Sequence, residues 1–386
     1  MNIDQVKVFM DHIREHAVRY FPGFVAEQTD VDLIDKQERP AATLYRFQVK
    51  DEAQVRSIIV KVPLRTSSGS WVGGIGYEKP LLFPKVESRE MHRLQYQALV
   101  AIDEYFRALD KKQLGAIRVL DYLPQYHAIF TEELRDPDLR QLLLRESRLH
   151  PLAAKQKLTV VFQNAGTWLC MYHTMPKKED VHVRDQHRDD YVEAINQLTS
   201  FLGKSAGNRS FFQQISSIII NQAQEILPEA LPLGLGHGDY AMRNILVSPN
   251  ARVTVLDTFS KWRTPIYEDI GYFLSALQTT FPQVISQGLT FSRGQLDAYE
   301  QAFLKGYFGQ KSIPYPAIRL YEILALLDKW SSVRVSSYRR GGKLKIAGRA
   351  MAALTSPYFK RYINSLLKEL TALQAGVTTM NPKRSY

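Results

Sequence analysis

The sequence lacks the features that stabilise secreted proteins or anchor membrane proteins. Its single cysteine, Cys170, excludes a disulfide within the chain. No stretch approaches about 18 consecutive apolar residues, the shortest run typical of a membrane-spanning helix. Residues 1–20 mix charged and apolar residues at helical spacing, without the apolar segment and cleavage site of a signal peptide. We therefore expect a cytoplasmic protein.

Several catalytic patterns are also missing. The glycines of residues 67–80 fit neither G-x-G-x-x-G nor a Walker pattern, so this stretch is not expected to cradle phosphates. No Gly-x-Ser-x-Gly occurs, which removes the main signal of an α/β-hydrolase. The segment HIREH, from His12 to His16, formally fits a zinc-binding His-x-x-Glu-His pattern, but no clear third ligand accompanies it. A zinc enzyme is therefore disfavoured.

Negative charge is scarce relative to positive charge. The chain has 39 acidic residues and 50 lysines and arginines, a formal net charge of +11. This balance favours an anionic partner such as a nucleotide, a nucleic acid, an acidic glycan or a membrane surface, although evenly scattered solvated side chains explain it equally well. No recognised nucleic-acid-binding motif is present, so nucleic acid is not an expected partner.

The chain does contain two regions of different periodicity. Short β-rich runs bounded by turn residues, with one amphipathic helix among them, predict an antiparallel meander followed by a helix and two further strands. They cover residues 31–37, 43–49, 57–63, 89–109, 116–123 and 127–134. Helical periodicity then dominates residues 139–226 and 268–374, with a short β insert between them. We expect an α+β fold with an N-terminal lobe at 1–134 and a larger, mostly helical lobe at 135–386.

The most informative stretch is HGDYAMRNILVSPNARVTVLD, from His237 to Asp257. Two apolar strands joined by SPNA predict a hairpin, which would bring Asn244 near the start of one strand close to Asp257 at the end of the other. Amide and carboxylate oxygens are ligands suited to Mg²⁺ bound with substrate phosphates. Asp239 could then accept a proton from an attacking hydroxyl. This division of roles is typical of phosphoryl transfer from ATP to an alcohol.

The stretch closely resembles the signature of the aminoglycoside phosphotransferase and choline kinase family, the small-molecule branch of the protein-kinase-like proteins. The family pattern is His-x-Asp, four residues, Asn, and a metal-binding Asp after a hairpin; here these are His237, Asp239, Asn244 and Asp257. The resemblance implies a bilobal protein-kinase-like fold, ATP and Mg²⁺ as cofactors, and a small-molecule hydroxyl as acceptor. It covers about residues 25–335.

The resemblance also implies roles for other residues of the nucleotide-binding lobe. Lys61, in IIVKVP, is similar to the strand lysine that contacts the α and β phosphates. Glu90 would pair with it, with Glu87 as the rival. IFTEEL is similar to the linker whose backbone holds the adenine, at Glu132, Glu133 and Leu134.

In the catalytic lobe the resemblance implies that His237 and Asp269 support the catalytic loop rather than transfer protons. Arg243, four residues after Asp239, resembles the placement in some tyrosine kinases and would stabilise phosphate charge; a surface arginine is the alternative. The chain departs from the family after Asp257, where TFSKW lacks the Phe-Gly of protein kinases.

The acceptor is indicated only by charge. Residues 336–362 concentrate basic side chains with interleaved aromatics, in a region where the family builds its acceptor pocket, and would suit an anionic glycan or a membrane surface or remain simply solvated. Pockets for cationic acceptors need carboxylates or aromatic faces. We therefore expect a neutral or anionic sugar, glycan or lipid-linked polyol. A cationic acceptor of the aminoglycoside or choline type, and a catalytically silent binding module, are the alternatives.

Overall fold

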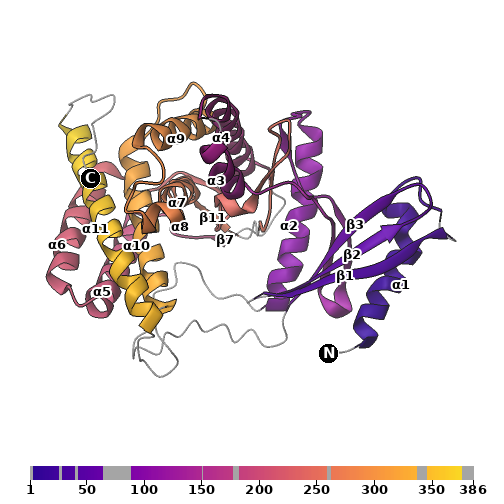
Figure 1. The fold of residues 1–386 in the computed structure, drawn as a ribbon. Helices are drawn as coiled ribbons and strands as arrows, with labels where there is room; N and C mark the ends of the chain where they lie inside the picture. The colour runs from indigo at the N-terminus through magenta and orange to yellow at the C-terminus, as the bar shows by residue number, and fades with distance from the viewer. Residues whose placement is uncertain are drawn as a thin grey trace. The chain divides into compact units, whose positions relative to one another are not determined.

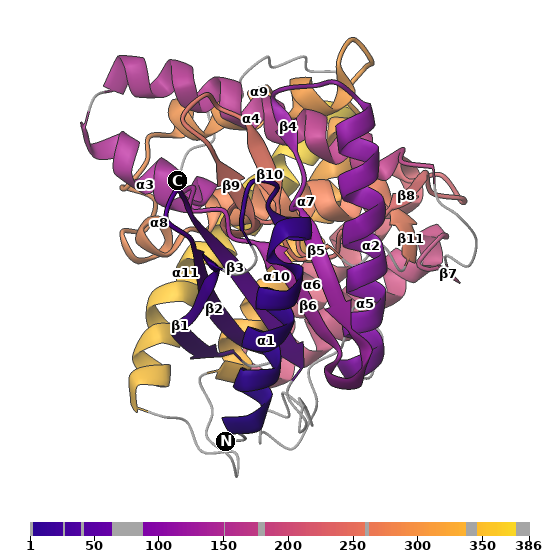
Figure 2. The same cartoon turned by 90° about the vertical axis from the view of Figure 1, so that its right-hand side faces the viewer.

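The computed structural model describes residues 3–25, 28–39, 42–63, 88–149, 151–176, 182–258, 262–336 and 346–375. The chain forms two compact units (Figures 1 and 2). The described residues of the first unit are those between 3 and 136 together with 254–258, and those of the second are 137–253 and 262–375. The first unit therefore includes the end of the second hairpin strand and the residues directly after it, which the expected boundary at residue 134 does not include.

A five-stranded antiparallel sheet in the order β1-β2-β3-β6-β5 forms the centre of the first unit. Its elements are α1 (Ile3–Tyr20), β1 (Asp30–Glu38), β2 (Ala42–Lys50), β3 (Val55–Pro63), α2 (Ser88–Ala108), β4 (Leu114–Gly115), β5 (Val119–Leu123) and β6 (Ala128–Glu132). The predicted meander, the helix after it and the two later strands are thus confirmed.

The alternation of buried side chains along β3 determines on which face of the sheet its lysine lies. Ile58, Val60 and Val62 are buried in the core that the sheet shares with α1, around Phe9 and Phe47. Because successive strand side chains point to opposite faces, Lys61 belongs to the face away from α1.

The second unit is mostly helical, as predicted. Its helices are α3 (Leu139–Leu149), α4 (Pro151–His173), α5 (Arg188–Ser205), α6 (Arg209–Ile226), α7 (Ile266–Gln278), α8 (Phe281–Ile285), α9 (Arg293–Phe308), α10 (Tyr315–Ser336) and α11 (Ile346–Gln374). None of the helices in the described part of the chain is both long and apolar enough to cross a membrane.

Helices α4 and α9 pack unusually closely, and two glycines permit it. A Cβ atom on Gly166 would lie 1.9 Å from the carbonyl oxygen of Phe303, and one on Gly306 would lie 2.0 Å from that of Gln163. Any larger side chain would push the helices apart. This packing matters because α4 also supports the loop that follows β8.

Helices α9, α10 and α11 are joined by a buried charge cluster. The guanidinium of Arg319 on α10 donates to Glu300 of α9, to Glu322 of its own helix at 2.8 Å and to Glu369 of α11 at 2.8 Å. All four side chains are at most 9% exposed. Because a buried charge without its partner is costly, this cluster fixes how the three helices meet.

Short strands complete the second unit. The predicted hairpin is present, with β9 (Ile245–Val247) and β10 (Val253–Val255) joined by a turn in which Ser248 N donates to Arg252 O at 3.0 Å. A second small sheet, in the order β7-β11-β8, was not predicted; it consists of β7 (His182–Val183), β11 (Trp262–Pro265) and β8 (Leu233–Leu235). Its strands have two to four residues, too few for a pattern in sequence.

Candidate active site

The loop after β8 is held by a buried carboxylate. Asp269 on α7 is 3% exposed and accepts the backbone N–H groups of His237 at 2.7 Å and Gly238 at 2.9 Å. Gly238 has φ = +80°, a conformation that residues with a side chain rarely adopt. The two N–H groups therefore converge on one carboxylate because a glycine permits the turn.

Asp269 is itself oriented by His173 at the end of α4. The Nε2 atom of His173 lies 3.0 Å from Asp269 Oδ2, and its Nδ1 atom lies 2.7 Å from the hydroxyl of Tyr307. Burial alone would raise the pKa of Asp269, but the hydrogen bonds from His173 and His237 outweigh it and hold the pKa below its ordinary value. Asp269 therefore stays ionised and holds the backbone of this loop.

Aromatic side chains enclose the same loop. Tyr240 is fully buried and donates to Ala165 O on α4 at 2.7 Å, while Trp168 stacks against the ring of Tyr240 and also contacts His237. His237 is 1% exposed, and its Nδ1 atom accepts from Asp239 N at 3.3 Å. A histidine in this environment supports the backbone of the loop.

Asp239 lies at the surface of this rigid loop, within a compact group of polar side chains. Arg243 donates to its carboxylate, at 2.7 Å to Oδ2, and Asn244 Nδ2 donates to both the backbone oxygen and Oδ2 of Asp239 at 2.9 Å. The Asp239 side chain is 36% exposed and that of Arg243 45%. The four-residue and five-residue spacings thus bring the three side chains together through the single turn Met242–Asn244.

Tyr272 on α7 joins this group. Its hydroxyl interacts with the side chains of both Asp239 and Arg243. Burial opposes the charge on Arg243, but Asp239 and Tyr272 more than compensate and raise the pKa of the guanidinium. The arginine is therefore a permanent cation beside Asp239, and Tyr272 is a residue of this site that the sequence did not indicate.

In the first unit, Lys61 and Asp257 form an ion pair. Lys61 Nζ lies 2.7 Å from Asp257 Oδ1, and Gln95 Nε2 on α2 donates to the same oxygen at 3.1 Å. Asp257 has φ = +57°, a left-handed backbone uncommon for an aspartate. This turn presents the side chain to Lys61. The expected neighbourhood of Asp257 and Asn244 stays a prediction, because the two belong to different units.

The expected pairing of Lys61 with Glu90 stays a prediction, and in this structure each of the two residues has another partner. The Glu90 carboxylate accepts two hydrogen bonds from Arg93, at 2.8 and 3.0 Å, one turn further along α2. Within the described residues, the only carboxylate that contacts Lys61 is Asp257. Glu87, the rival candidate, lies outside the described residues. Gln95, rather than a glutamate, is the α2 side chain that the structure brings to this pair.

In the linker expected to hold adenine, two backbone N–H groups already form hydrogen bonds with neighbouring backbone. Glu132 N donates to Arg118 O at 3.0 Å, and Glu133 N donates to Ser57 O at 2.9 Å. Within the described residues, Leu134 N has no hydrogen-bond acceptor. The N–H that could serve a purine is therefore that of Leu134.

The donor atoms at the two expected magnesium positions suit a hard cation. Asn244 uses its Nδ2 atom for Asp239, which directs its amide oxygen elsewhere, and the Asp257 side chain is 51% exposed. Oxygen donors of this kind are typical for Mg²⁺ shared with phosphates. The residues in each unit therefore fit the ion that the sequence predicts.

A pocket of about 450 Å³ adjoins the Asp239 group within the second unit. Arg243 and Tyr272 form one wall, and α8, α10 and α11 contribute Phe281, Lys329 and Phe359. This volume is in the range of small-molecule sites. Lys329 was not singled out in the sequence, although a lysine inside the apolar run LALLDKW is a detectable signal.

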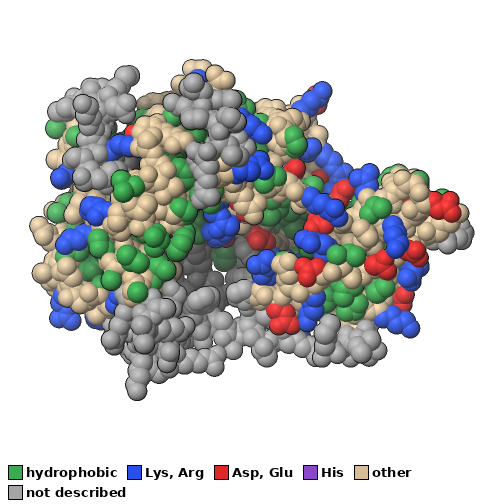
Figure 3. All heavy atoms as spheres, viewed as in Figure 1, with side chains coloured by type: hydrophobic (Ala, Val, Ile, Leu, Met, Phe, Trp, Pro, Cys, Tyr) green, Lys and Arg blue, Asp and Glu red, His purple; other side chains and the backbone are tan. Residues whose placement is uncertain are grey.

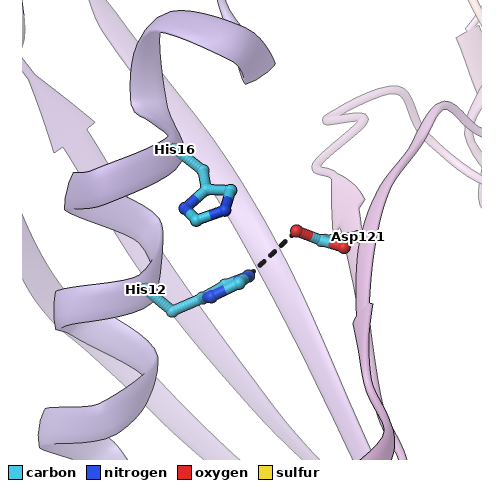
Figure 4. A group of neighbouring side chains, drawn as sticks. All are labelled: His12, His16 and Asp121. Carbon is cyan, nitrogen blue, oxygen red and sulfur yellow. Dashed lines mark hydrogen bonds and ion pairs between the residues drawn. The ribbon is translucent and has the colours of Figure 1, made fainter.

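A second cluster of possible metal ligands lies in the first unit, where α1 meets β5 (Figure 4). His12 Nε2 lies 2.9 Å from Asp121 Oδ2, and the His16 ring stacks on that of His12. Asp121 thus provides the third group that the sequence did not reveal. However, Arg19 and Tyr20 also donate to the same Asp121 oxygen. A cation there would have to displace an arginine, so the cluster is better explained as a hydrogen-bonded packing contact.

Part of the expected acceptor region lies outside the described residues. Residues 337–345, which carry Arg339, Arg340, Lys343 and Lys345, lie outside the described residues. The remainder of the 336–362 stretch belongs mainly to α11, whose residues Met351, Thr355 and Phe359 line the pocket.

Comparison with known proteins supports the fold. No protein-family model matches the chain, and no curated protein matches its sequence. Among solved structures, the choline kinase of Cryptosporidium parvum Iowa II is similar over 98% of this chain and 99% of that chain, with a TM-score of 0.53 and 11% identity. A candidate aminoglycoside phosphotransferase of Ralstonia eutropha JMP134 covers 92% of this chain and 98% of its own, with a TM-score of 0.53 and 13% identity. The chain therefore has the bilobal α+β, protein-kinase-like fold that these proteins share.

Proposed function

We propose that this protein is an ATP- and Mg²⁺-dependent phosphotransferase that moves the γ-phosphoryl group to a hydroxyl of a small molecule. The observation that carries the proposal is the group formed by Asp239, Arg243 and Asn244 on a loop held by Asp269. It combines a carboxylate, a permanent cation and an amide oxygen, the groups that phosphoryl transfer to an alcohol requires.

The site residues of the second unit each have a defined role in this proposal. Asp239 orients the acceptor hydroxyl and takes its proton as the oxygen attacks phosphorus. Arg243, which donates to Asp239 in the structure, shifts toward the transferred phosphoryl group and stabilises its charge. His237 and Asp269 keep the loop backbone in place throughout.

In the first unit, Lys61 contacts the α and β phosphates, and backbone groups of Glu132, Glu133 and Leu134 hold the adenine, with Leu134 supplying the N–H because those of Glu132 and Glu133 are bonded within the sheet. Mg²⁺, when bound, neutralises the triphosphate charge; Asn244 and Asp257 would hold it. Because Lys61 contacts Asp257 at 2.7 Å in the structure, ATP binding replaces one carboxylate partner of the lysine with phosphate oxygens. The exchange costs little free energy because the pair is partly exposed to solvent.

The acceptor in this proposal is a neutral or anionic sugar, glycan or lipid-linked polyol. Three cationic side chains line the pocket beside Asp239, namely Arg140, Arg243 and Lys329, against one carboxylate, Asp328. Contact of the 336–362 stretch with an anionic glycan or membrane surface would be consistent with such an acceptor.

Calorimetry with ATP in the presence and absence of Mg²⁺, followed by a phosphorylation screen against kanamycin, choline and a panel of sugars, tests the proposal. We expect magnesium-dependent nucleotide binding and transfer to a sugar-like alcohol. Absence of magnesium-dependent binding would refute it. A silent binding module would bind nucleotide and acceptor unchanged after Asp239→Ala, whereas the enzyme would lose turnover.

A further inference from the structure

The pocket beside Asp239 contains a lysine that forms no ion pair with a carboxylate of the described residues. Within the described residues, no carboxylate oxygen lies within ion-pair distance of Lys329 Nζ, which donates to Thr279 Oγ1 at 3.4 Å. The ammonium also lies 4.8 Å from the centre of the Tyr272 ring. A long hydrogen bond and a ring face are weak compensation for a half-buried charge.

The other two cations of the pocket differ from Lys329 because each has a carboxylate. Arg243 is paired with Asp239, and Arg140 lies 3.7 Å from Asp138. Lys329 is therefore the charge for which a bound molecule would supply the missing partner.

The surroundings of Lys329 are unfavourable for its charge. Burial lowers its pKa to about 7, and the nearby Arg243 adds to the effect, while Asp239 and Asp328 oppose it. A cationic acceptor placed here would meet two like charges, whereas an anion would restore the protonated lysine and gain from Arg243. The pocket thus selects by the charge of its ligand.

We propose that the acceptor of this phosphotransferase is an alcohol that already carries a phosphate or carboxylate, and that Lys329 binds this anionic group while the hydroxyl is directed at Asp239. The inference rests on the proposed function and narrows its acceptor. Apolar side chains of the pocket, among them Phe281, Met351 and Phe359, leave room for the carbon skeleton. Figure 3 shows hydrophobic side chains at the surface over α11, one of the helices that contribute to this pocket.

The test compares ligands that differ only in the anionic group. We would titrate the protein by calorimetry with glucose 6-phosphate, glucuronate and glucose, and with kanamycin as a cation. We expect one or both anions to bind about tenfold or more tightly than glucose. The two anions distinguish a phosphate from a carboxylate subsite. Equal or weaker binding of both anions than of glucose, or a preference for kanamycin, would overturn the inference.

Two substitutions make the test specific to Lys329. Lys329→Met should abolish the preference for the anion, and Lys329→Arg should retain most of it. Lys305→Met, at an exposed lysine of α9, removes the same net charge and should leave the preference intact. An unchanged preference in folded Lys329→Met protein would contradict the assignment.

Nucleotide binding separates this inference from the proposed function. Magnesium-dependent ATP affinity should be the same in Lys329→Met and unsubstituted protein. If ATP binds but neither anion is preferred, only the acceptor assignment fails; if ATP does not bind at all, the phosphotransferase proposal fails as well.

Discussion

Asp257 in the first unit and Asp269 in the second are both carboxylates with several hydrogen-bond donors, but their environments differ. Asp257 receives Lys61 and Gln95 on one oxygen and is 51% exposed. Asp269 receives two backbone N–H groups and His173 and is 3% exposed. The first contact consists of movable side chains, and the second consists largely of fixed backbone.

The difference indicates how each carboxylate is used. An exposed ion pair contributes about 0–1 kcal/mol, so Asp257 can exchange Lys61 for another cation at little expense. Removal of one member of a buried charged network costs about 3–5 kcal/mol, so Asp269 holds its loop permanently. We infer that the loop carrying Asp239 is preorganised, whereas the pair of Lys61 and Asp257 can rearrange.

The largest expected effect is on turnover. Asp239→Asn keeps the shape of the side chain but removes the proton acceptor, and we expect the phosphorylation rate to fall about 10²–10⁴-fold with little change in stability. Rates would be measured on the acceptor found in the screen. Asp189→Asn, at an exposed carboxylate of α5, is the control and should keep full activity. A rate within a factor of about two of the unsubstituted protein would rule out Asp239 as the base.

The second-largest expected effect is on stability, on substitution of the buried carboxylate Asp269. Asp269→Asn leaves too few acceptor sites for two N–H groups and His173, so we expect the free energy of unfolding to fall by about 3–5 kcal/mol. Urea unfolding would measure this change. A loss below about 1 kcal/mol would mean that Asp269 is no firmer a support than an exposed pair.

The matching substitution in the first unit should weaken ligand binding rather than lower stability. For Asp257→Asn we expect a change in unfolding free energy within about 1 kcal/mol, together with magnesium-dependent ATP affinity weakened about tenfold or more. Asp32→Asn is the matched control, because Asp32 is a similarly exposed carboxylate 2.9 Å from Lys50. It should reproduce the small stability change and leave ATP binding alone.

The pH dependence of stability gives a smaller effect in the second unit. The pKa of Lys329 is about 7 in the folded protein against 10.5 for an ordinary lysine. Between these values the unfolded chain binds more protons, so this residue's contribution to stability rises with pH over that window and is lost as pH falls toward 7. The charged and titratable groups around it are Arg140, Asp239, Arg243, Tyr272, Glu322 and Asp328.

Lys329→Met removes this dependence. Chemical unfolding at pH 7 and pH 9.5 should show that the unsubstituted protein gains stability relative to the variant at the higher pH. Lys329→Arg, which stays charged, should show no such gain over Lys329→Met. Parallel pH profiles for all three proteins would contradict the assignment.

The smallest expected effect belongs to Glu90. Its bond to Arg93 is an exposed contact three residues apart on α2, so Glu90→Gln should cost about 0.2–0.5 kcal/mol and leave ATP affinity unchanged. Gln95→Ala, which removes a contact to Asp257, should weaken ATP binding more than Glu90→Gln does. If Glu90→Gln weakened ATP binding more than Gln95→Ala, the pairing of Lys61 with Glu90 would be supported instead.

The sequence predicted the regular parts of the fold well, for a local reason. The period of two in residues 43–49 and 57–63 and the helical period of 157–175 are set by which face each element buries. The sheet of β7, β8 and β11 escaped prediction because its strands are too short to show a period. Assignment of 254–258 to the first unit depends on tertiary contacts and has no local signal.

In the candidate site, too, local features could be predicted from the sequence and tertiary contacts could not. Asp239, Arg243 and Asn244 could be predicted together because they lie within one turn, where spacing alone controls proximity. The partner of Lys61 could not, since Glu90 and Gln95 are both on α2 and only the packing of that helix decides which of them reaches the pair. His173 and Tyr272 were missed because their roles depend on contacts across about 100 and 30 residues of chain, respectively.

The sequence by itself determined the two periodic regions, the loop with its three polar side chains, and the excess of positive charge. All of these follow from neighbours a few residues apart, for which backbone geometry fixes distance. Only the tertiary structure decided that Asp257 meets Lys61, that Asp269 is buried under the loop, and that Lys329 faces a pocket without an ion-pair partner among the described residues. Burial and charge pairing depend on which distant helices and strands pack together, and that packing is a property of the whole chain.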